Sequence, residues 1–295
     1  MSVWLITGAA RGLGAAIVEA VLAAGHQVVA GARNPLDVLE RFGERDDLLA
    51  VGLDVTNEGQ VERAVRSGVE RFERIDVAVN NAGYGVLGAV EEVSDAEAMA
   101  MFEVNVFGVH RVIRSVLPVM REQRSGLIMN IGSGGGFAAS AAHGLYGATK
   151  FAVEAITEAL DIEIRPLGLR AIVIEPGAFR TDFFSDASIR SAAVQLEAYR
   201  TADGGDRREA FRTVDGLQPG DPAKAGAALL HLADLDDPPL RVQLGRDSLA
   251  RVEAKLEFVG RELDRWRELA ESTDFDDAGQ GFVDPGRVAA AGSTH

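Results

Sequence analysis

The chain has 295 residues, a formal net charge of −15 and a hydrophobic content of 47%. That composition is ordinary for a globular protein and supplies enough apolar side chains for a core. The acidic balance argues against nucleic acid or an anionic membrane surface as a partner. The absence of Cys excludes disulfides, thiol chemistry and cysteine metal sites. No metal site of another kind is predicted.

The amino terminus, MSVWLITGAA, runs directly into an apolar strand pattern without a basic stretch, so no signal peptide is expected. No uncharged apolar run is long enough to span a membrane, because Glu19 and His26 interrupt the best candidate. These features predict a soluble, acidic, cytoplasmic protein.

Short apolar runs alternate with longer segments of helical spacing. The predicted buried strands are residues 3–6, 27–30, 48–53, 77–79, 127–131 and 171–174, with a late strand at 241–244. The predicted helices are residues 13–24, 58–72, 96–121, 146–165 and 248–269. This alternation predicts an α/β fold in which a parallel sheet is covered by helices on both faces.

The predicted organisation is a single domain over residues 1–271, followed by a tail. Residues 183–217 are polar, weakly periodic and interrupted by DGGD, which predicts either a mobile substrate flap or a pair of poorly packed helices. Residues 272–295 have the composition of a loose tail.

The segment TGAARGLG follows the first strand and precedes a helix, which is the context of a dinucleotide site. In that interpretation Gly8 permits the turn out of the strand, Gly12 admits the pyrophosphate, and Gly14 allows close packing. The start of the helix would then offer free N–H groups to the phosphates. The spacing is not the generic G-x-G-x-x-G, and the alternative is three turn glycines in an Ala/Gly-rich chain.

The end of the second strand, HQVVAGARNP, indicates which nicotinamide cofactor is bound. Ala32 and Arg33 stand where an NAD site usually has an acidic residue for the ribose hydroxyl. A guanidinium can instead bind a 2′-phosphate, so NADP(H) is predicted over NAD(H). Arg11 could add a second positive charge, whereas Arg33 could also be a solvated loop residue. Asp54 either meets the adenine edge or caps the next helix.

Tyr146 and Lys150, in YGATK, lie one helical turn apart and therefore share a face. A phenol with its usual pKa of about 10 is a poor base at neutral pH. An adjacent ammonium lowers that pKa, so the pair is suited to proton transfer during carbonyl–alcohol interconversion. Ser133, at the end of the fifth strand, could hydrogen-bond the substrate oxygen. The alternatives are an exposed helix start and a turn-forming serine.

Together these segments resemble the short-chain dehydrogenase/reductase family over residues 2–244. The matching pieces, in order, are TGAARGLG, LDVT, NNAG at 80–83, FEVNVFG, IGS, YGATK and EPGAFRTD. The resemblance implies a Rossmann-type doubly wound parallel sheet and a catalytic tetrad of Asn105, Ser133, Tyr146 and Lys150. Asn105 would lie at a helix distortion and anchor a water, and Lys150 would also bind the nicotinamide ribose.

The resemblance also implies the cofactor contacts and the strand-tying role of Asn80. The predicted cofactor residues are Gly8, Arg11, Gly12, Leu13, Gly14, Arg33, Asp54, Val55, Asn81, Ala82, Gly83, Tyr146, Lys150, Pro176, Gly177, Phe179 and Thr181. Phe179 replaces a smaller branched residue, and its contact is expected through the backbone. His143 is expected to be a surface or pocket-wall residue.

The segment after NNAG and the long C-terminal extension are similar to the branch of 17β-hydroxysteroid and retinol dehydrogenases. The predicted pocket wall is apolar and consists of Tyr84, Val86, Phe137, Leu145, Phe179, Phe183 and Phe184. It suggests a small apolar ketone or aldehyde, reduced reversibly to the alcohol. The rival hypothesis is a non-catalytic NADP(H)-binding sensor or scaffold. A homodimer or homotetramer is expected from the family's use of its long helices.

Overall fold

The computed structural model describes residues 1–185, 188–200, 206, 208, 211, 213 and 215–275. The main sheet contains β1 (Val3–Thr7), β2 (Gln27–Ala32), β3 (Leu48–Gly52), β4 (Val77–Asn80), β6 (Gly126–Ile131), β7 (Leu169–Pro176) and β9 (Arg241–Leu244). Its order is β3-β2-β1-β4-β6-β7-β9, and all its pairs are parallel. The predicted Rossmann-type sheet is confirmed, and the strand order reverses beside β1, where such folds bind ligands.

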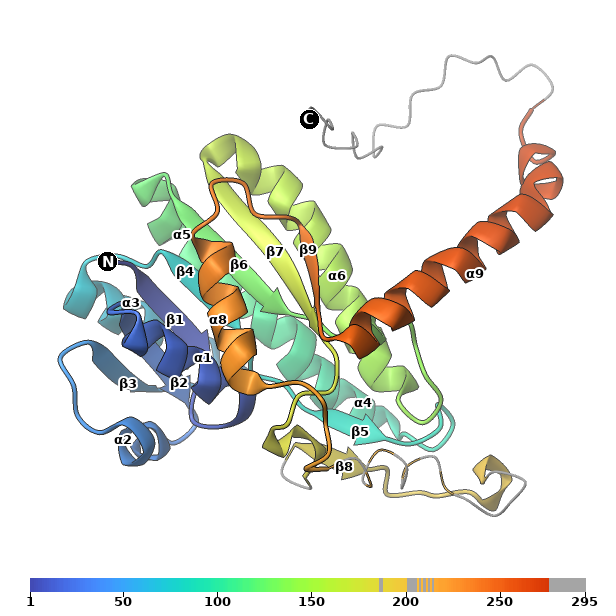
Figure 1. Ribbon diagram of the computed structural model, residues 1–295, viewed down its shortest axis with the longest axis horizontal. Coiled ribbons are helices and arrows are strands. Elements are labelled where there is room, and N and C mark those ends of the chain that lie inside the picture. The colour runs from blue at the N-terminus through green and yellow to red at the C-terminus, as the bar shows by residue number, and fades with distance from the viewer. Residues whose placement is uncertain are drawn as a thin grey trace. The chain divides into compact units, whose positions relative to one another are not determined.

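Helices cover both faces of this sheet (Figure 1). The α-helices of the described residues are α1 (Gly12–Ala23), α2 (Leu36–Phe42), α3 (Glu58–Phe72), α4 (Asp95–Phe102), α5 (Val109–Gln123), α6 (Gly144–Ile164), α8 (Pro222–Ala233) and α9 (Arg246–Glu271). Short 3₁₀ turns lie at η2 (Gly134–Gly136), η3 (Arg165–Leu167), η4 (Asp182–Phe184) and η5 (Glu197–Tyr199). Among the described residues, no helix combines the length and apolar character needed to cross a bilayer.

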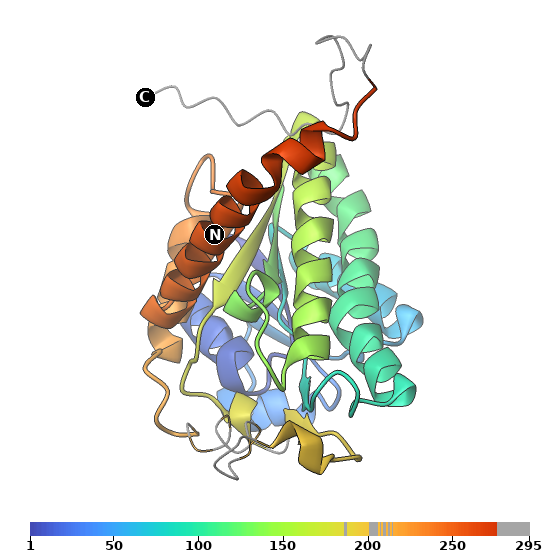
Figure 2. The same ribbon diagram turned by 90° about the vertical axis from the view of Figure 1, so that its right-hand side faces the viewer.

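The core consists of two apolar layers separated by the sheet. Trp4 and Ile6 pack with α1 and α8 on one face, whereas Leu5 packs with α3, α5 and α6 on the other. Figure 2 shows α5 and α6 side by side on that second face. Because successive strand residues point to opposite faces, a fully apolar strand supplies both layers.

The predicted helix 96–121 is divided into three parts. α4 ends at Phe102, a π-helix, η1, spans Glu103–Gly108, and α5 follows. A side chain at Gly108 would lie 2.6 Å from Val55, so this helix packs unusually close to the segment after β3. π-Helical segments often occur at functional sites, and Asn105 lies within this one.

Four of the described strands and α-helices were not predicted, namely β5 (Gly85–Leu87), β8 (Ile189–Ser191), α2 and α8. β5 and β8 form a small parallel sheet, and β8 lies in the predicted flap. α8 begins with Asp221, whose side chain accepts from Ala223 N at 2.9 Å, followed by Pro222 at the first helical position. Asp-Pro is a recognisable helix start, so the sequence did contain the signal for α8.

The described part of the predicted flap is held to the region after β5 by polar contacts. The Glu92 carboxylate accepts from Ala89 N at 2.8 Å and from Leu196 N at 2.6 Å. Arg208 donates to the same carboxylate at 2.8 and 2.9 Å, and both side chains are buried. A buried ion pair needs such additional hydrogen bonds to offset its desolvation.

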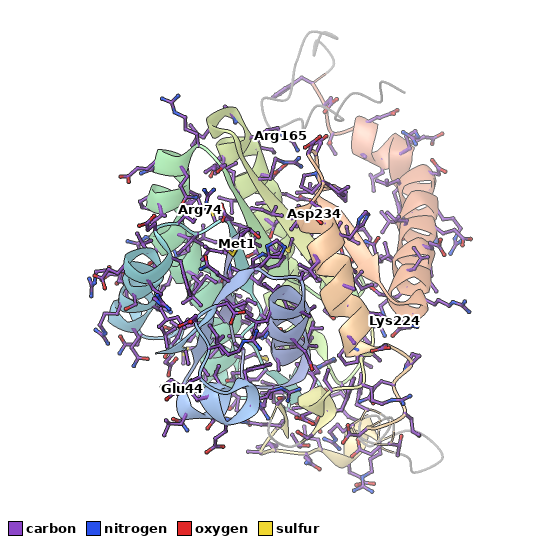
Figure 3. The ribbon with its side chains drawn as sticks, turned by 60° about the vertical axis from the view of Figure 1, so that its left-hand side comes forward. Met1, Glu44, Arg74, Arg165, Lys224 and Asp234 are labelled. Carbon is purple, nitrogen blue, oxygen red and sulfur yellow. The ribbon has the colours of Figure 1, made fainter. Side chains whose placement is uncertain are left out.

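At the opposite end of the sheet, ion pairs join α6 to β7. Asp161 is bridged by Arg165 at 2.6 Å and by Arg170 at 2.9 Å, and both arginines also pair with Asp237. Arg165 is labelled in Figure 3, at the end of α6. These contacts stabilise the end of the sheet away from the cavity described below.

Residues Met1–Val252 form one compact unit, and a second begins at Glu253, within α9. The predicted extension of the domain to residue 271 stays a prediction. Of the predicted tail, only residues 272–275 are among those described, and residues 276–295 lie outside them.

Candidate functional site

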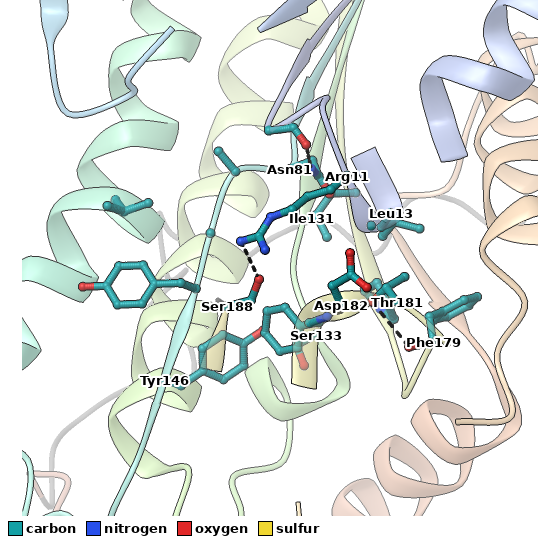
Figure 4. Close-up of a pocket in the computed structure, with 18 of the residues that line it drawn as sticks. Arg11, Leu13, Asn81, Ile131, Ser133, Tyr146, Phe179, Thr181, Asp182 and Ser188 are labelled. Atoms are coloured by element: carbon teal, nitrogen blue, oxygen red, sulfur yellow. Dashed lines mark hydrogen bonds between the residues drawn. The ribbon is translucent and has the colours of Figure 1, made fainter. Parts of the chain in front are cut away.

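A cavity of about 1200 Å³ opens at the carboxyl ends of the central strands (Figure 4). The predicted residues that line it are Gly8, Arg11, Gly12, Leu13, Arg33, Asp54, Val55, Asn81, Ala82, Gly83, Ser133, Tyr146, Lys150, Pro176, Gly177, Phe179 and Thr181. Of the predicted site residues, Gly14 and Asn105 lie behind this lining rather than in it. The volume exceeds what one small substrate needs and leaves room for a dinucleotide beside it.

The glycine loop forms one wall of the cavity. Gly12 has a φ of +56°, which favours glycine, and a side chain there would meet only Thr181. A side chain at Gly14 would lie 2.2 Å from the Gly8 carbonyl oxygen, so this position requires glycine for close packing. No side chain caps the first turn of α1. The loop therefore fits an anionic group held by backbone N–H groups.

Two neighbouring asparagines at the end of β4 stabilise this wall. The Asn81 amide donates to Thr7 O at 2.9 Å and to Gly8 O at 3.1 Å, which holds the glycine loop against β4. Asn80 donates to Asn130 at 2.8 Å and so connects β4 with β6. The predicted strand-tying role of Asn80 is confirmed.

The far end of the cavity is polar. Arg33 is exposed where β2 ends, and Asp37, in the first turn of α2, lines the same end. Asp54 accepts hydrogen bonds from Thr56 N at 2.9 Å and from its hydroxyl at 2.8 Å. Asn57 caps α3, so the alternative that Asp54 caps this helix is wrong. Both bonds use Asp54 Oδ1 and close a turn that begins three residues before the cap.

Arg11 connects the glycine loop with the other side of the cavity. Its Nη2 donates to Ser188 Oγ at 2.9 Å, as Figure 4 shows. This contact joins the α1 end of the cavity to the residue that precedes β8. A contact of Arg11 with a 2′-phosphate stays a prediction.

Tyr146 and Lys150 are buried, with 5% and 6% of their surface exposed. Lys150 Nζ donates to Ile131 O at 2.7 Å and lies 5.8 Å from the centroid of the Tyr146 ring. The Ser133 hydroxyl hydrogen-bonds the phenol and accepts from Gly135 N at 3.0 Å. The alternative of an exposed amphipathic helix start is therefore wrong.

The electrostatics of this pair differ from the expectation. Burial raises the pKa of Tyr146, and the hydrogen bond from Ser133 opposes that shift only in part. Burial also lowers the pKa of Lys150 to about 8, against the attraction of Glu154. Desolvation is the largest cause of the Tyr146 shift and Lys150 is not among its causes, so the predicted lowering of the phenol pKa is not found in the protein alone. The phenol is held protonated at neutral pH.

Asn105 supports the site from behind. Its amide donates to Tyr84 O at 2.8 Å and to Thr149 Oγ1 at 3.1 Å, and its oxygen accepts from Tyr84 N at 3.1 Å. These bonds use both ends of the side chain, which is fully buried. The side chain therefore fixes the chain after β4 relative to α6. Its predicted role of anchoring a water is not tested by these contacts.

Aromatic side chains surround the phenol. His143 stacks on Tyr146 with ring centroids 4.3 Å apart, and Phe211 lies 5.0 Å from His143. Phe183 is 5.9 Å from Tyr146. Burial, with a smaller contribution from Arg251, lowers the pKa of His143 to about 4, so this ring is neutral. The expected pocket-wall position of His143 is confirmed.

The predicted pocket wall is only partly right. Tyr84, Phe179, Phe183 and Phe184 line the cavity, whereas Val86, Phe137 and Leu145 do not. Val86 and Leu145 pack in a small core beside the cavity, and Phe137 lies under the guanidinium of Arg241. Three further residues of the lining were not predicted: Phe211 and Arg190, from the weakly periodic segment 183–217, and Arg251, from the predicted helix 248–269.

A buried group of charges lies one helical turn beyond Lys150. Arg241 pairs with Glu154 at 3.0 Å, with Glu175 at 2.9 Å and with Glu158 at 2.5 Å. Burial, and then the neighbouring charge of Glu175, raises the pKa of Glu154 to about 7. One arginine faces three carboxyl groups, so Glu154 retains its proton well above the usual pH range.

Glu154→Gln should change how stability depends on pH. A carboxyl group with a raised folded-state pKa costs stability as pH rises from its unfolded pKa through its folded pKa. As the pH rises from 5 to 8, the unfolding free energy of wild type should therefore fall by about 2 kcal/mol relative to that of the variant. Urea unfolding at both pH values measures this. Glu158→Gln, at a more exposed partner of Arg241, is the control and should show little change. A pH-independent difference would contradict the assignment.

Comparisons with known proteins agree with this geometry. A family model described as short chain dehydrogenase matches residues 2–191. The protein named oxidoreductase BOA17 from Botryotinia fuckeliana is 37% identical over 271 residues, covering 91% of this chain and 97% of the relative. A short-chain dehydrogenase structure from Streptomyces avermitilis shares 37% identity with a TM-score of 0.82, covering 93% of this chain and all of that one.

Two further solved structures carry nicotinamide cofactors. An alcohol dehydrogenase from Thermococcus sibiricus, complexed with 5-hydroxy-NADP, shares 27% identity with a TM-score of 0.65, over 83% of this chain and 96% of that one. A 3-ketoacyl-(acyl-carrier-protein) reductase from Brucella melitensis, complexed with NADH, shares 27% identity with a TM-score of 0.69, over 83% and 98%. Similar folds thus hold either form of the cofactor.

Proposed function

Because this chain belongs to the short-chain dehydrogenase/reductase family and is an oxidoreductase, we propose that it reduces an apolar ketone or aldehyde to the alcohol, reversibly, with NADPH. The observation that carries this proposal is one cavity with two chemically different ends. Buried Tyr146 and Lys150 lie with half-buried Ser133 at one end, and exposed Arg33 lies at the other.

The residues around the cavity fit a dinucleotide. The open first turn of α1 would hold the pyrophosphate, and Arg33 would hold the 2′-phosphate of NADPH. Lys150 would bind the nicotinamide ribose, and the loop of Pro176, Gly177 and Phe179 would meet the carboxamide. When bound there, NADPH supplies the hydride that adds to the carbonyl carbon.

The protein side of the reaction is proton transfer. Ser133 would orient the carbonyl oxygen, and Tyr146 would donate its phenolic proton to that oxygen as the alcohol forms. The phenol of Tyr146 carries its proton at neutral pH, so it would act as the general acid for reduction. Lys150, which is also buried, would return a proton through the water expected at Asn105.

The substrate end favours an apolar compound. Phe183, Phe184 and Phe211 line the cavity with the neutral ring of His143, so apolar and aromatic surfaces meet the carbonyl group. All three phenylalanines lie within residues 183–217, the segment predicted as a substrate flap. That segment would thus contribute to substrate selection.

The test is the consumption of NADPH and of NADH with a panel of apolar ketones and aldehydes. We expect turnover with NADPH on at least one apolar carbonyl, and a lower kcat/KM with NADH. Tight binding of NADPH without turnover on any of these compounds would favour the sensor or scaffold hypothesis. A preference for NADH would be consistent with the proposed carbonyl reduction but would reject the proposed binding of the 2′-phosphate by Arg33.

We also propose that the chain is a homodimer or homotetramer. Phe107 in η1 and Phe151 and Ile162 on α6 are 42–52% exposed. Large apolar side chains in such numbers on a helical surface are typical of protein interfaces. Sedimentation equilibrium should give two or four times the chain mass of 31.3 kDa. Phe151→Glu should lower that mass, whereas a monomeric wild type would reject the proposal.

A further inference from the structure

The turn between β9 and α9 lies against the site but has no role in the proposed reaction. Gly245 connects the two elements, and Arg246, Asp247 and Ser248 begin α9; all four residues belong to the compact unit of Met1–Val252. Asp247 and Ser248 both line the cavity. Their contacts reach two loops that come from different strands, β7 and β6.

Asp247 holds the loop that follows β7. Its Oδ2 accepts a hydrogen bond from Ala178 N at 2.7 Å. Ala178 lies between Gly177 and Phe179, in the loop proposed to meet the nicotinamide carboxamide. The bond is charge-assisted, and such bonds are roughly twice as strong as neutral ones.

The space for this carboxylate depends on two glycines. A side chain at Gly177 would lie 2.1 Å from Asp247 Oδ1, and one at Gly245 would lie 2.7 Å from it. Gly245 also has a φ of +98°, which other residues rarely adopt. The chain thus has glycine on both sides of Asp247, where any larger residue would displace the carboxylate.

Ser248 contacts both loops at once. It is 1% exposed, and its hydroxyl donates to Glu175 O near the end of β7 at 2.8 Å. A side chain at Gly134 would lie 2.8 Å from Ser248 Oγ, so Gly134 allows the loop after Ser133 to approach it. Ser248 therefore lies between the end of β7 and the residue next to Ser133.

We propose that Asp247 and Ser248 are positioning residues, which set the nicotinamide loop and the Ser133 loop at a fixed separation. The inference rests on the proposed function, since it assigns the Pro176–Phe179 loop to the nicotinamide half of the cofactor. Hydride transfer needs the reacting atoms aligned within a few tenths of an ångström, so a small displacement of either loop is costly. Asp247 acts mainly on cofactor binding, and Ser248 acts on the geometry of Ser133.

The test for Asp247 compares the affinity for the complete cofactor with the affinity for a fragment that contains only its adenosine half. Calorimetry should show that Asp247→Ala weakens NADP⁺ about tenfold. The affinity for adenosine 2′,5′-bisphosphate should be unchanged, because this fragment occupies only the Arg33 end. Asp247→Asn keeps an oxygen acceptor for Ala178 N and should bind NADP⁺ within about threefold of wild type. Arg246→Ala, at the adjacent exposed residue, is the matched control and should match wild type.

The outcomes separate this inference from simpler roles. Asp247 also lies in the first turn of α9, where an acid stabilises any helix. If that were its whole role, NADP⁺ and the bisphosphate would be affected equally, and the inference would be overturned. Wild-type affinity of Asp247→Ala for NADP⁺ would overturn it too. A wild-type protein that binds no nicotinamide cofactor would instead reject the proposed function itself.

Ser248→Ala tests the second loop. Loss of the hydroxyl should lower kcat about three- to tenfold while the Kd of NADP⁺ stays within twofold of wild type. A lower kcat with an unchanged Kd of NADP⁺ distinguishes Ser248→Ala from Asp247→Ala, in which the affinity for the cofactor changes most. Equal changes in kcat and cofactor affinity in both variants would show that the turn has a general structural role and would overturn the inference.

Discussion

Tyr146→Phe should lower carbonyl turnover by about 10²–10⁴-fold, the usual contribution of a positioned general acid. The phenol is the group proposed to protonate the substrate oxygen, and phenylalanine keeps its ring and its stacking on His143. The affinity for NADPH should stay within about threefold, because the hydroxyl accounts for at most one of many cofactor contacts. Steady-state kinetics and cofactor titration of the same preparation measure both quantities.

Tyr84→Phe is the matched control for this prediction. Tyr84 also presents a phenol to the cavity but lies outside the proposed proton path. Its variant should retain most of the wild-type turnover. If Tyr146→Phe is as active as Tyr84→Phe, the proposed mechanism is wrong. If neither wild type nor variants turn over any carbonyl while all bind NADPH, the sensor or scaffold hypothesis gains support.

Arg33→Ala should weaken NADPH by about 10–100-fold and leave NADH nearly unchanged. Removing one charged hydrogen-bond partner costs about 1.5–3 kcal/mol, and each 1.4 kcal/mol is tenfold in affinity. NADH has no phosphate for Arg33 to contact, so its affinity should not depend on the guanidinium. Titration of both cofactors at one fixed salt concentration measures the ratio, since exposed charges are screened by salt.

Arg190→Ala provides the control for Arg33. Arg190 is another arginine of the cavity lining, but it lies over the ring of Tyr84, beside the substrate end. Removing the Arg190 guanidinium should change the affinities for NADPH and NADH equally, if at all. Equal weakening of NADPH and NADH by Arg33→Ala would mean that Arg33 is only a solvated loop residue. Arg11→Ala tests whether the guanidinium of Arg11 also contributes to binding the 2′-phosphate of NADPH.

The sequence predicted the main sheet because buried parallel strands leave an unbroken apolar run. All seven strands of the main sheet were predicted, and their bounds agree within two residues at every end. The short β5 and β8 were missed, since three residues that pair across about a hundred positions have no local periodicity. The single helix expected over 96–121 missed η1, because close packing against Val55 and the bonds of Asn105 come from other parts of the chain.

For the candidate site, order and spacing were sufficient to name residues of which all but Gly14 and Asn105 line the cavity. Motifs such as TGAARGLG and YGATK are local, and the parallel topology brings strand ends together at one edge. Phe211, Arg190 and Asp247 could not be named in this way. They reach the cavity from segments that carry no motif, and only the folded chain brings them there.

What the sequence by itself determined is the family, the parallel fold and the identity of the central side chains, because each depends on residue type and local spacing. The tertiary structure alone decided the pKa shifts at the site. Burial raises the pKa of Tyr146, which the sequence predicted to be lowered, and burial lowers the pKa of His143 to about 4. Desolvation depends on everything packed around a group, and residues distant in sequence supply most of that packing.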